Sequence, residues 1–206
     1  MKNQLLKTLQ KDLTRAKKLL KLCFIGLGNP GSKYNSTRHN VGKEWLLNLS
    51  KSHCSDFVPK TNIEAEITYS NSEEILWVIP DNYVNSSGST VAKLVKNINL
   101  PNNKIIIFHD DLDLNPGEVR FKEGGGHGGH NGLKDIFEKT GSKDYLRIRI
   151  GIGHPGHKDM VSDWVLNKFH PTDKEYVDRA FDLFALNFDT LCNQEFSKLQ
   201  KRLHTK

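Results

Sequence analysis

Cysteine is scarce in this 206-residue chain, and its three residues stand far apart. Cys23, Cys54 and Cys192 form no C-x-x-C pair, which argues against a disulfide framework or a cysteine-based zinc site and favours a reducing compartment. No run of apolar residues approaches the ~20 that span a bilayer, and no apolar signal segment stands near the first residues. From these absences we expect a cytoplasmic protein whose cysteines serve in packing.

Sequence patterns for several kinds of catalysis are missing too. No G-x-S-x-G elbow presents a serine nucleophile, and no cysteine has neighbours that would favour a thiolate. His127 and His130 lack the histidine and glutamate spacing of zinc proteases. Internal repeats and low-complexity linkers are also absent. We therefore expect one domain in which water attacks the substrate directly.

Charge is distributed unevenly along the chain. The formal net charge is +6, and residues 1–21 carry all of it, because seven Lys and Arg stand there against one Asp. Apolar residues recur in this segment at helical spacing, namely Leu5, Leu9, Leu13, Ala16 and Leu20. This pattern predicts a basic amphipathic helix. It has four interpretations: a helix docked on the body, a nucleic-acid or membrane-surface contact, a targeting segment, or a wrongly assigned start. We favour an accessory helix or partly ordered arm.

The remaining residues, 22–206, balance their charges, so a polyanion would have to bind at a local basic patch. Apolar segments typical of strands alternate there with amphipathic segments typical of helices. Strands are expected at 21–27, 63–69, 75–79, 104–108 and 145–153, and helices at 41–51, around 91–98, at 133–140 and beyond 171. This alternation indicates one α/β domain, in which a twisted, mostly parallel or mixed sheet is covered by helices on both faces.

The stretch 24–42 combines a strand, a glycine-rich turn and a histidine. Gly26, Gly28 and Gly31 fit the dinucleotide-binding pattern G-x-G-x-x-G, but turn-forming residues follow where that motif needs a helix. His39 lies just beyond, and imidazole is the side chain best suited to proton transfer near neutral pH. A ligand-holding turn beside a general base is therefore favoured over a dinucleotide-dependent oxidoreductase.

Six short motifs follow one another along the chain. They are Gly26-Leu-Gly-Asn-Pro-Gly31, Tyr34-x-x-Thr37-Arg-His-Asn-x-Gly42, Asn85-x-Ser-Gly88, His109-Asp-Asp-Leu-Asp113, Gly124-Gly-Gly-His-Gly-Gly-His-Asn-Gly-Leu-Lys134 and Arg147-x-Arg-Ile-Gly-Ile-Gly-His-Pro-Gly156. In this order they resemble the bacterial-type peptidyl-tRNA hydrolase family over about residues 22–200. The resemblance implies a monomeric esterase that frees tRNA from prematurely released peptidyl-tRNA, without metal or organic cofactor. A tRNA- or ribosome-binding protein that has lost catalysis is the alternative.

The resemblance also implies roles for single residues. His39 would be the general base that activates water, Asp110 would orient it, and Asn29 would help to distinguish N-blocked from free aminoacyl-tRNA. Contacts with the peptide and the acceptor end of tRNA are implied for Asn85, Asn131, Tyr34 and Tyr83. Basic residues near these motifs are expected to meet tRNA phosphates as a local patch; they are Arg120, Lys122, Lys134, Arg147 and Arg149.

Three residues depart from the family pattern. Val84 stands where methionine is usual, Asn82 where threonine is common, and Asp111 where glutamate is frequent. Since Val84 and Asn82 adjoin Asn85, we expect the peptide side of the pocket to differ in shape.

Overall fold

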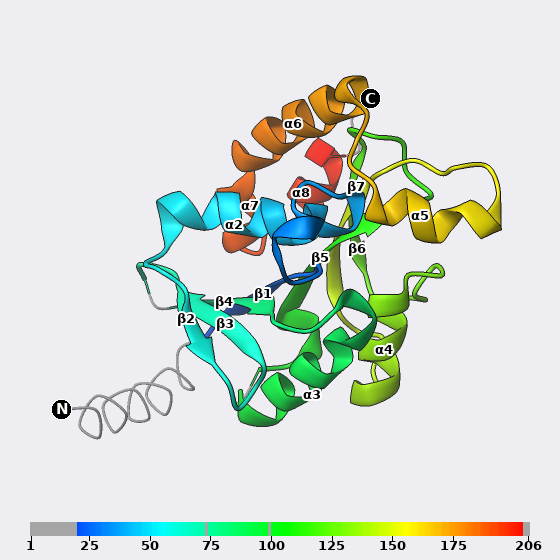
Figure 1. Cartoon of the computed structure of the whole chain (residues 1–206). Coiled ribbons are helices and arrows are strands. Elements are labelled where there is room, and N and C mark those ends of the chain that lie inside the picture. The colour runs from blue at the N-terminus through cyan, green and yellow to red at the C-terminus, as the bar shows by residue number, and fades with distance from the viewer. Residues whose placement is uncertain (1–19, 73, 99, 204–206) are drawn as a thin grey trace.

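A seven-stranded mixed sheet forms the centre of the protein (Figure 1). The computed structural model describes residues 20–72, 74–98 and 100–203. The strand order is β2-β3-β4-β1-β5-β7-β6. Four parallel strands make up the middle: β4 (Ile75–Pro80), β1 (Leu22–Gly26), β5 (Ile105–Asp111) and β7 (Leu146–Gly151). Antiparallel pairs extend both edges, with β3 (Ala65–Tyr69) and β2 (Val58–Lys60) on one side and β6 (Val119–Glu123) on the other.

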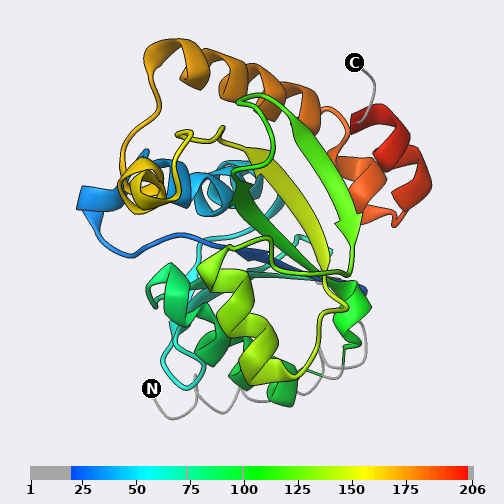
Figure 2. The same ribbon diagram turned by 90° about the vertical axis from the view of Figure 1, so that its right-hand side faces the viewer.

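Helices cover both faces of the sheet, as the sequence predicts (Figure 2). One face carries α2 (Val41–His53), α6 (Pro171–Ala185), α7 (Phe188–Cys192) and α8 (Phe196–Leu203). The other carries α3 (Ser87–Asn97) and α4 (Asn131–Thr140). Short 3-10 helices lie at Ser32–Tyr34, Arg38–Asn40, Val84–Ser86, Asn102–Lys104 and Lys158–Met160, and the last leads into α5 (Val161–Leu166). Among the described residues, no helix combines the length and apolarity needed to cross a bilayer.

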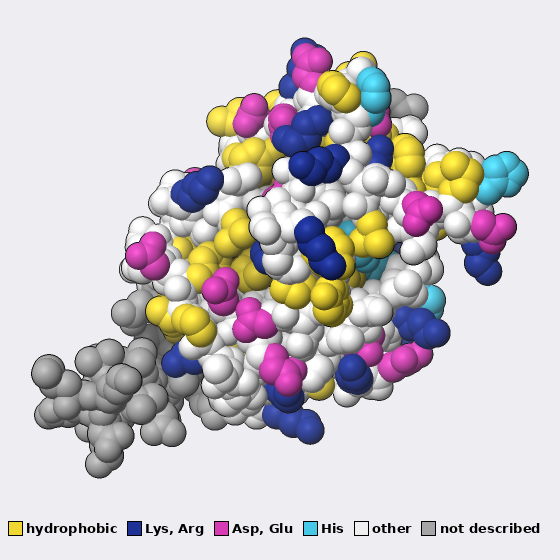
Figure 3. Space-filling model, viewed as in Figure 1, with side chains coloured by type: hydrophobic (Ala, Val, Ile, Leu, Met, Phe, Trp, Pro, Cys, Tyr) yellow, Lys and Arg dark blue, Asp and Glu magenta, His cyan; other side chains and the backbone are white. Residues whose placement is uncertain are grey.

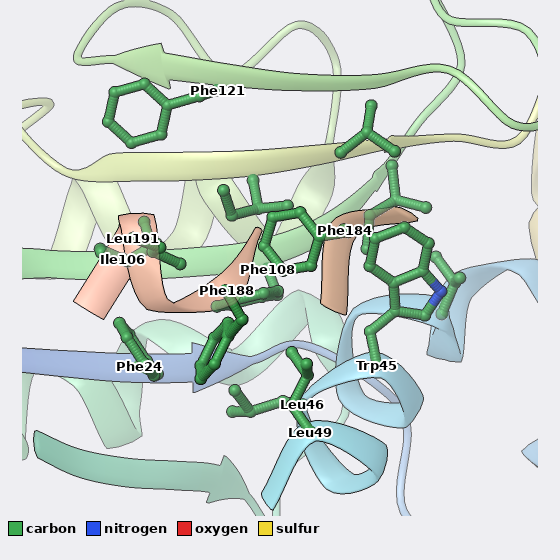
Figure 4. Close-up of a cluster of buried hydrophobic side chains, with 14 of the residues drawn as sticks. Phe24, Trp45, Leu46, Leu49, Ile106, Phe108, Phe121, Phe184, Phe188 and Leu191 are labelled. Carbon is green, nitrogen blue, oxygen red and sulfur yellow. The ribbon is translucent and has the colours of Figure 1, made fainter. Parts of the chain in front are cut away.

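An aromatic cluster holds the α2 and α7 side of the sheet together (Figure 4). Phe24 of β1 meets Trp77, Phe188 and Phe108 edge-on, with ring centroids 5.1, 5.5 and 5.9 Å away. All four rings are at most 1% exposed. Each buried apolar side chain of this size contributes roughly 1.5–3 kcal/mol, and edge-to-face pairs add about 0.5–1.5 kcal/mol. The cluster therefore fixes β1 and β5 side by side.

Gly42 brings the start of α2 against the end of β5. A Cβ at this position would lie 2.3 Å from the carbonyl oxygen of Phe108, closer than any side chain tolerates. The amide of Leu27 also donates to that oxygen over 3.0 Å. The turn Arg38–Asn40, immediately before α2, is thereby held beside the last residues of β5.

Most expected elements are found, with informative differences. The strand expected to end at Phe108 continues to Asp111, because His109 to Asp111 pair with β7. Strands β2 and β6 and helix α5 were not anticipated, and each is short and partly exposed. After Gly31 the chain forms only a 3-10 helix, so the helix of a dinucleotide motif is absent from this position, as expected. The predicted N-terminal helix falls largely on residues 1–19, outside the described residues.

Candidate active site

A cavity of about 670 Å³ opens at the carboxyl ends of the central strands. This is where open α/β sheets place their ligands. Polar walls come from the loops after β1 and β4, from the end of β5 and from the start of α4. They contain Asn29, Tyr34, His39, Tyr83, Asn85, Asp110 and Asn131. The structure thus brings together seven residues that the sequence selected from four separate segments. Figure 3 shows hydrophobic side chains gathered across the middle of this side of the molecule, beside a recessed histidine surface.

His39 and Asp110 form a hydrogen-bonded pair in the cavity wall. Nδ1 of His39 lies 2.9 Å from each carboxylate oxygen of Asp110. An ionised carboxylate only accepts, so Nδ1 carries the proton of a neutral ring and Nε2 keeps its lone pair. Asp110 is 3% exposed, whereas the side chain of His39 is 14% exposed. Nε2 is therefore the basic atom that the pair leaves available.

Burial and charge shift the pKa values of His39 and Asp110 in opposite directions. Burial disfavours the imidazolium, but the charge and hydrogen bond of Asp110 outweigh it and raise the pKa of His39. Burial alone would likewise raise the pKa of Asp110, yet the histidines beside it and their hydrogen bonds hold that pKa well below its usual range. Asp110 is consequently a carboxylate throughout the neutral range, able to stabilise a proton arriving on His39.

His130 is a second histidine on the same carboxylate, and sequence analysis predicted no catalytic role for it. Its Nε2 lies 3.0 Å from Oδ1 of Asp110. Its Nδ1 accepts hydrogen bonds from the amides of Gly132 and Leu133, which makes His130 the N-cap of α4. A histidine immediately before a predicted helix is the available sequence signal, but its link to Asp110 depends on the tertiary fold.

One group of side chains in the described part of the chain has metal-ligand spacing: His39, Asp110 and His130, with ligand atoms within 4.8 Å of one another. The hydrogen bonds of His130 do not suit a metal ion. Both backbone amides occupy its Nδ1, so its Nε2 must carry the ring proton and has no lone pair to give. The donor set therefore fits a hydrogen-bonded network and not a metal centre.

Asn29 is held by hydrogen bonds that leave its side-chain N–H donor available to a ligand. Its main-chain amide donates to Oδ1 of Asn40 over 2.8 Å, and Asn40 returns a bond to the carbonyl of Asn29 over 3.0 Å. Its own Oδ1 accepts from the amide of Val84 over 2.9 Å. No described residue accepts from Nδ2 of Asn29, and the residue lines the cavity. That N–H group is available to bind an acceptor, such as a carbonyl oxygen or an oxyanion.

The other predicted substrate residues lie around the cavity mouth. Asn85 and Asn131 are exposed. The ring of Tyr83 is 51% exposed and meets Tyr34 edge-on, with centroids 6.0 Å apart. Two amides and two aromatic rings are thus open to a ligand that extends beyond the His39 pair.

Asn82, a departure from the family pattern, anchors the segment that carries Tyr83 and Asn85. Its Nδ2 donates to Oε2 of Glu64 over 3.0 Å and to Oγ1 of Thr90 over 3.1 Å. The amide of Asp81 also donates to the carbonyl of Glu64. The asparagine therefore supports the cavity wall from behind, while Asn82 itself is not among the lining residues.

Three of the predicted basic residues contact other groups of the protein, namely Arg147, Arg149 and Lys134. Arg147 is 3% exposed and donates to the carbonyls of Gly124 and Gly126, so a direct phosphate contact does not fit its burial. Its guanidinium instead holds the glycine-rich segment. Arg149 donates to Asp111 over 2.6 Å, and Lys134 lies 3.9 Å from Glu138 on α4.

Arg120 and Lys122 lie on the edge strand β6. Arg120 is opposite Arg149, and Lys122 is opposite Arg147, so the four basic residues share one face of the sheet. Lys122 is exposed, and Arg120 reaches Glu118 over 3.7 Å. From this strand the chain runs through the glycine-rich segment 124–130 into the cavity wall.

Arg38 attaches α5 to the turn Arg38–Asn40, a role that was not predicted from the sequence. Its Nη1 donates to the carbonyls of Trp164, Asn167 and Lys168 at the end of α5, over 3.3, 3.3 and 2.9 Å. Its guanidinium carbon lies 3.6 Å from the ring centroid of Trp164. Apolar residues of α5 face the cavity, among them Val161 and Val165. Arg38 thus positions an apolar wall next to His39.

Comparison with known proteins points to a single family. A family model described as peptidyl-tRNA hydrolase matches residues 23–206. Proteins named peptidyl-tRNA hydrolase are 41% identical in Francisella tularensis, over 89% of this chain and 97% of the relative, and 41% identical in Idiomarina loihiensis, over 88% and 93%. A crystal structure of peptidyl-tRNA hydrolase from Acinetobacter baumannii matches with a TM-score of 0.85 and 34% identity, over 90% of this chain and 96% of that one.

Proposed function

Because this chain belongs to the peptidyl-tRNA hydrolase family and hydrolyses peptidyl-tRNA, we propose that His39 activates the water that attacks the ester. The observation that carries this proposal is the bond between Nδ1 of His39 and Asp110, which leaves Nε2 as a base at the cavity. The pair is complete, so nothing favours an inactive tRNA-binding protein. No nucleophilic side chain is required, since water is the nucleophile.

The reaction follows from the atoms that remain available. Nε2 of His39 takes a proton from water while the water oxygen bonds to the carbonyl carbon of the ester. Asp110 stabilises the imidazolium that forms. The carbonyl oxygen becomes an oxyanion, to which Nδ2 of Asn29 donates. When the intermediate collapses, the ester bond to the ribose oxygen breaks and the imidazolium returns its proton to that oxygen. The products are the peptide carboxylic acid and the free tRNA hydroxyl.

The peptide part of the substrate would be bound by amide side chains. Asn85 and Asn131 can each donate to a peptide carbonyl and accept from a peptide N–H. An unblocked aminoacyl group has a charged ammonium and no such peptide bond, so it would lack these contacts. We therefore assign the preference for N-blocked substrates to these two residues together with Asn29.

The tRNA part would extend from the cavity along the surface. Tyr34 and Tyr83 offer rings on which bases at the acceptor end can stack, a contact worth about 1–3 kcal/mol per base. Arg120 and Lys122 would meet phosphates along β6. Since the substrate arises in translation, we place the protein in the cytoplasm, where it would act as a monomer with a basic extension at residues 1–21 and a catalytic domain at 22–206.

A comparison of two substrates tests the proposal. We expect release of tRNA from N-acetyl-aminoacyl-tRNA to be much faster than from the same tRNA with a free amino group. The His39→Ala variant should bind tRNA and fold normally but lose turnover of the blocked substrate. Equal turnover of both substrates, or an active alanine variant, would refute the assigned roles.

A further inference from the structure

His130 connects the catalytic carboxylate to the helix that carries Asn131. One ring nitrogen, Nε2, lies 3.0 Å from Oδ1 of Asp110. The other, Nδ1, lies 3.1 and 3.2 Å from the amide nitrogens of Gly132 and Leu133. The side chain is 8% exposed, so water has little access to compete for either nitrogen.

The partners of His130 determine its tautomer. A backbone N–H can only donate, so Nδ1 must present a lone pair to both amides. A neutral imidazole has one N–H, and this must then be on Nε2, pointing at the carboxylate. Protonation of Nδ1 would place an N–H against two other N–H groups and remove the helix cap. The arrangement therefore selects the neutral Nε2–H form.

We propose that His130 is a positioning residue, whose fixed Nε2–H group holds the Asp110 carboxylate toward His39 and ties the start of α4 to the catalytic pair. This inference rests on the proposed function of His39 and Asp110. Asn131 follows His130 directly as the first residue of α4. Capping by the same ring therefore also fixes where the Asn131 amide stands relative to His39.

Other titratable side chains lie around His130. His39 approaches it with ring centroids 5.2 Å apart, and His109 of β5 meets it edge-on at 5.1 Å. Burial lowers the pKa of His109 to about 3, so that neighbour is uncharged. His127 and Lys158 line the same cavity from the glycine-rich segment and from the turn before α5. The charge that His130 contacts is the carboxylate of Asp110.

Loss of the Nε2–H group should change the basicity of His39. The N–H dipole places partial positive charge next to Asp110 and so opposes the imidazolium on the other side of the carboxylate. Without it, the carboxylate would stabilise the imidazolium more strongly. The acidic limb of kcat/KM should then move to higher pH, because both carboxylate oxygens still lie within hydrogen-bonding distance of Nδ1 of His39. The pair would be held less firmly, which should lower kcat.

Two substitutions separate the two hydrogen bonds. In His130→Asn, the amide oxygen can still cap α4, because asparagine is among the best N-cap residues, but the side chain is too short to reach Asp110. In His130→Gln, the longer side chain can place an N–H near Asp110, while glutamine is not among the preferred caps. Each variant thus keeps one bond and loses the other.

We expect one variant to change the kinetics and the other to change the thermal stability. We expect His130→Asn to keep the wild-type Tm, to lose roughly tenfold in kcat, and to shift the acidic limb upward by roughly half a pH unit. We expect His130→Gln to keep the position of the limb while its Tm falls by about 2–4 °C. An acidic limb that does not move upward in His130→Asn would overturn the proposal.

A double variant and a spectroscopic measurement test the proposal in two further ways. In an Asp110→Asn background, His130→Asn should cause little further loss of kcat, because the shared partner is gone. Nitrogen-15 NMR of histidine-labelled protein should show a neutral Nε2–H ring for the signal that disappears in His130→Asn. A Nδ1–H or doubly protonated ring would overturn the proposal. This readout needs no turnover, so it is unaffected if the proposed reaction itself fails.

Discussion

At the scale of single residues, function depends on which atoms the fold leaves without partners. His39 uses Nδ1 to contact Asp110 and keeps Nε2 for the substrate. Asn29 uses Oδ1 to accept from Val84 and keeps Nδ2. The proposed base and the proposed oxyanion donor therefore face one cavity, and each is oriented by bonds that a substrate does not need to form.

The raised pKa of His39 predicts opposite pH trends for activity and stability. The base must be neutral, so kcat/KM should fall as pH drops through the raised pKa. Its stabilising contribution is fully present below the unfolded value of about 6.5 and is lost as pH rises through the folded pKa. Urea unfolding of wild type and His39→Ala should therefore show a stability difference that shrinks from pH 6 to pH 8. A constant difference would contradict the ion pair.

Replacement of Asp110 by asparagine should damage catalysis through the wrong tautomer. The asparagine amide can donate to Nδ1 of His39, which would move the ring proton to Nε2 and remove the base. We expect kcat to fall on the order of 10⁴-fold, as in hydrolytic triads altered in the same way. Asp113→Asn is a matched control, because its carboxylate is 72% exposed and does not contact His39. Comparable losses in both variants would argue against the assigned role.

At the scale of elements, α5 is the wall with the weakest support of its own. It has six residues and none of them is buried. Its position depends on Arg38 and on Trp164, whose indole N–H donates to the carbonyl of Gly153 over 2.9 Å. A short helix of this kind can shape a pocket only when side-chain contacts attach it to the rest of the protein.

Arg38→Lys should displace the α5 wall while leaving the His39 pair in place. Lysine keeps the charge but loses the planar guanidinium that stacks on Trp164 and donates to several carbonyls. We expect KM for N-blocked substrates to rise roughly tenfold, because the wall loses hydrogen bonds from a charged donor that contribute about 1.5–3 kcal/mol, with a smaller change in kcat. Trp164 fluorescence should become more accessible to quenchers.

Arg179→Lys provides the control for this experiment. Arg179 is exposed on α6 and pairs with Glu175. The control should leave both KM and the fluorescence unchanged. If Arg38→Lys lowers kcat alone and leaves KM and quenching as in the wild type, α5 is not positioned by this residue.

At the scale of the whole molecule, charge determines how the enzyme meets RNA. Residues 22–206 carry as many acidic as basic residues. Arg147 and Arg149 are engaged within the fold. On β6, Lys122 is exposed, whereas Arg120 is half-buried and donates to the carbonyl of Leu203. The body would therefore contact tRNA over a limited strip next to the glycine-rich segment.

Neutralising that strip should weaken tRNA binding in a salt-dependent way. The double variant Arg120→Gln, Lys122→Gln should reduce the slope of log affinity against log salt by about 1.8, since each phosphate contact contributes about 0.9. Turnover of a short substrate that ends at the 3′ adenosine should be unchanged. The control is Lys174→Gln, Arg179→Gln on α6, which removes the same charge elsewhere. Equal slopes for the two double variants would remove the β6 strip from the interface.

The local features of this protein could be predicted from its amino-acid sequence. Apolar runs and helical spacing gave the central strands and long helices, and the motif order indicated the family, including His39 and Asp110. These features are encoded over a few neighbouring residues, which is why spacing and residue type reveal them. Short elements such as β6 and α5 were missed because they have no buried periodic face of their own.

Which atoms contact one another could not be predicted in this way, because it depends on how the elements pack. The β5 strand brings Asp110 between His39 and His130, and the start of α4 fixes the ring of His130 by its amides. The same packing buries Arg147, which the sequence placed on the surface, and sets Arg38 against α5. Contacts between residues 20–130 positions apart depend on strand register and helix packing, which no local pattern specifies.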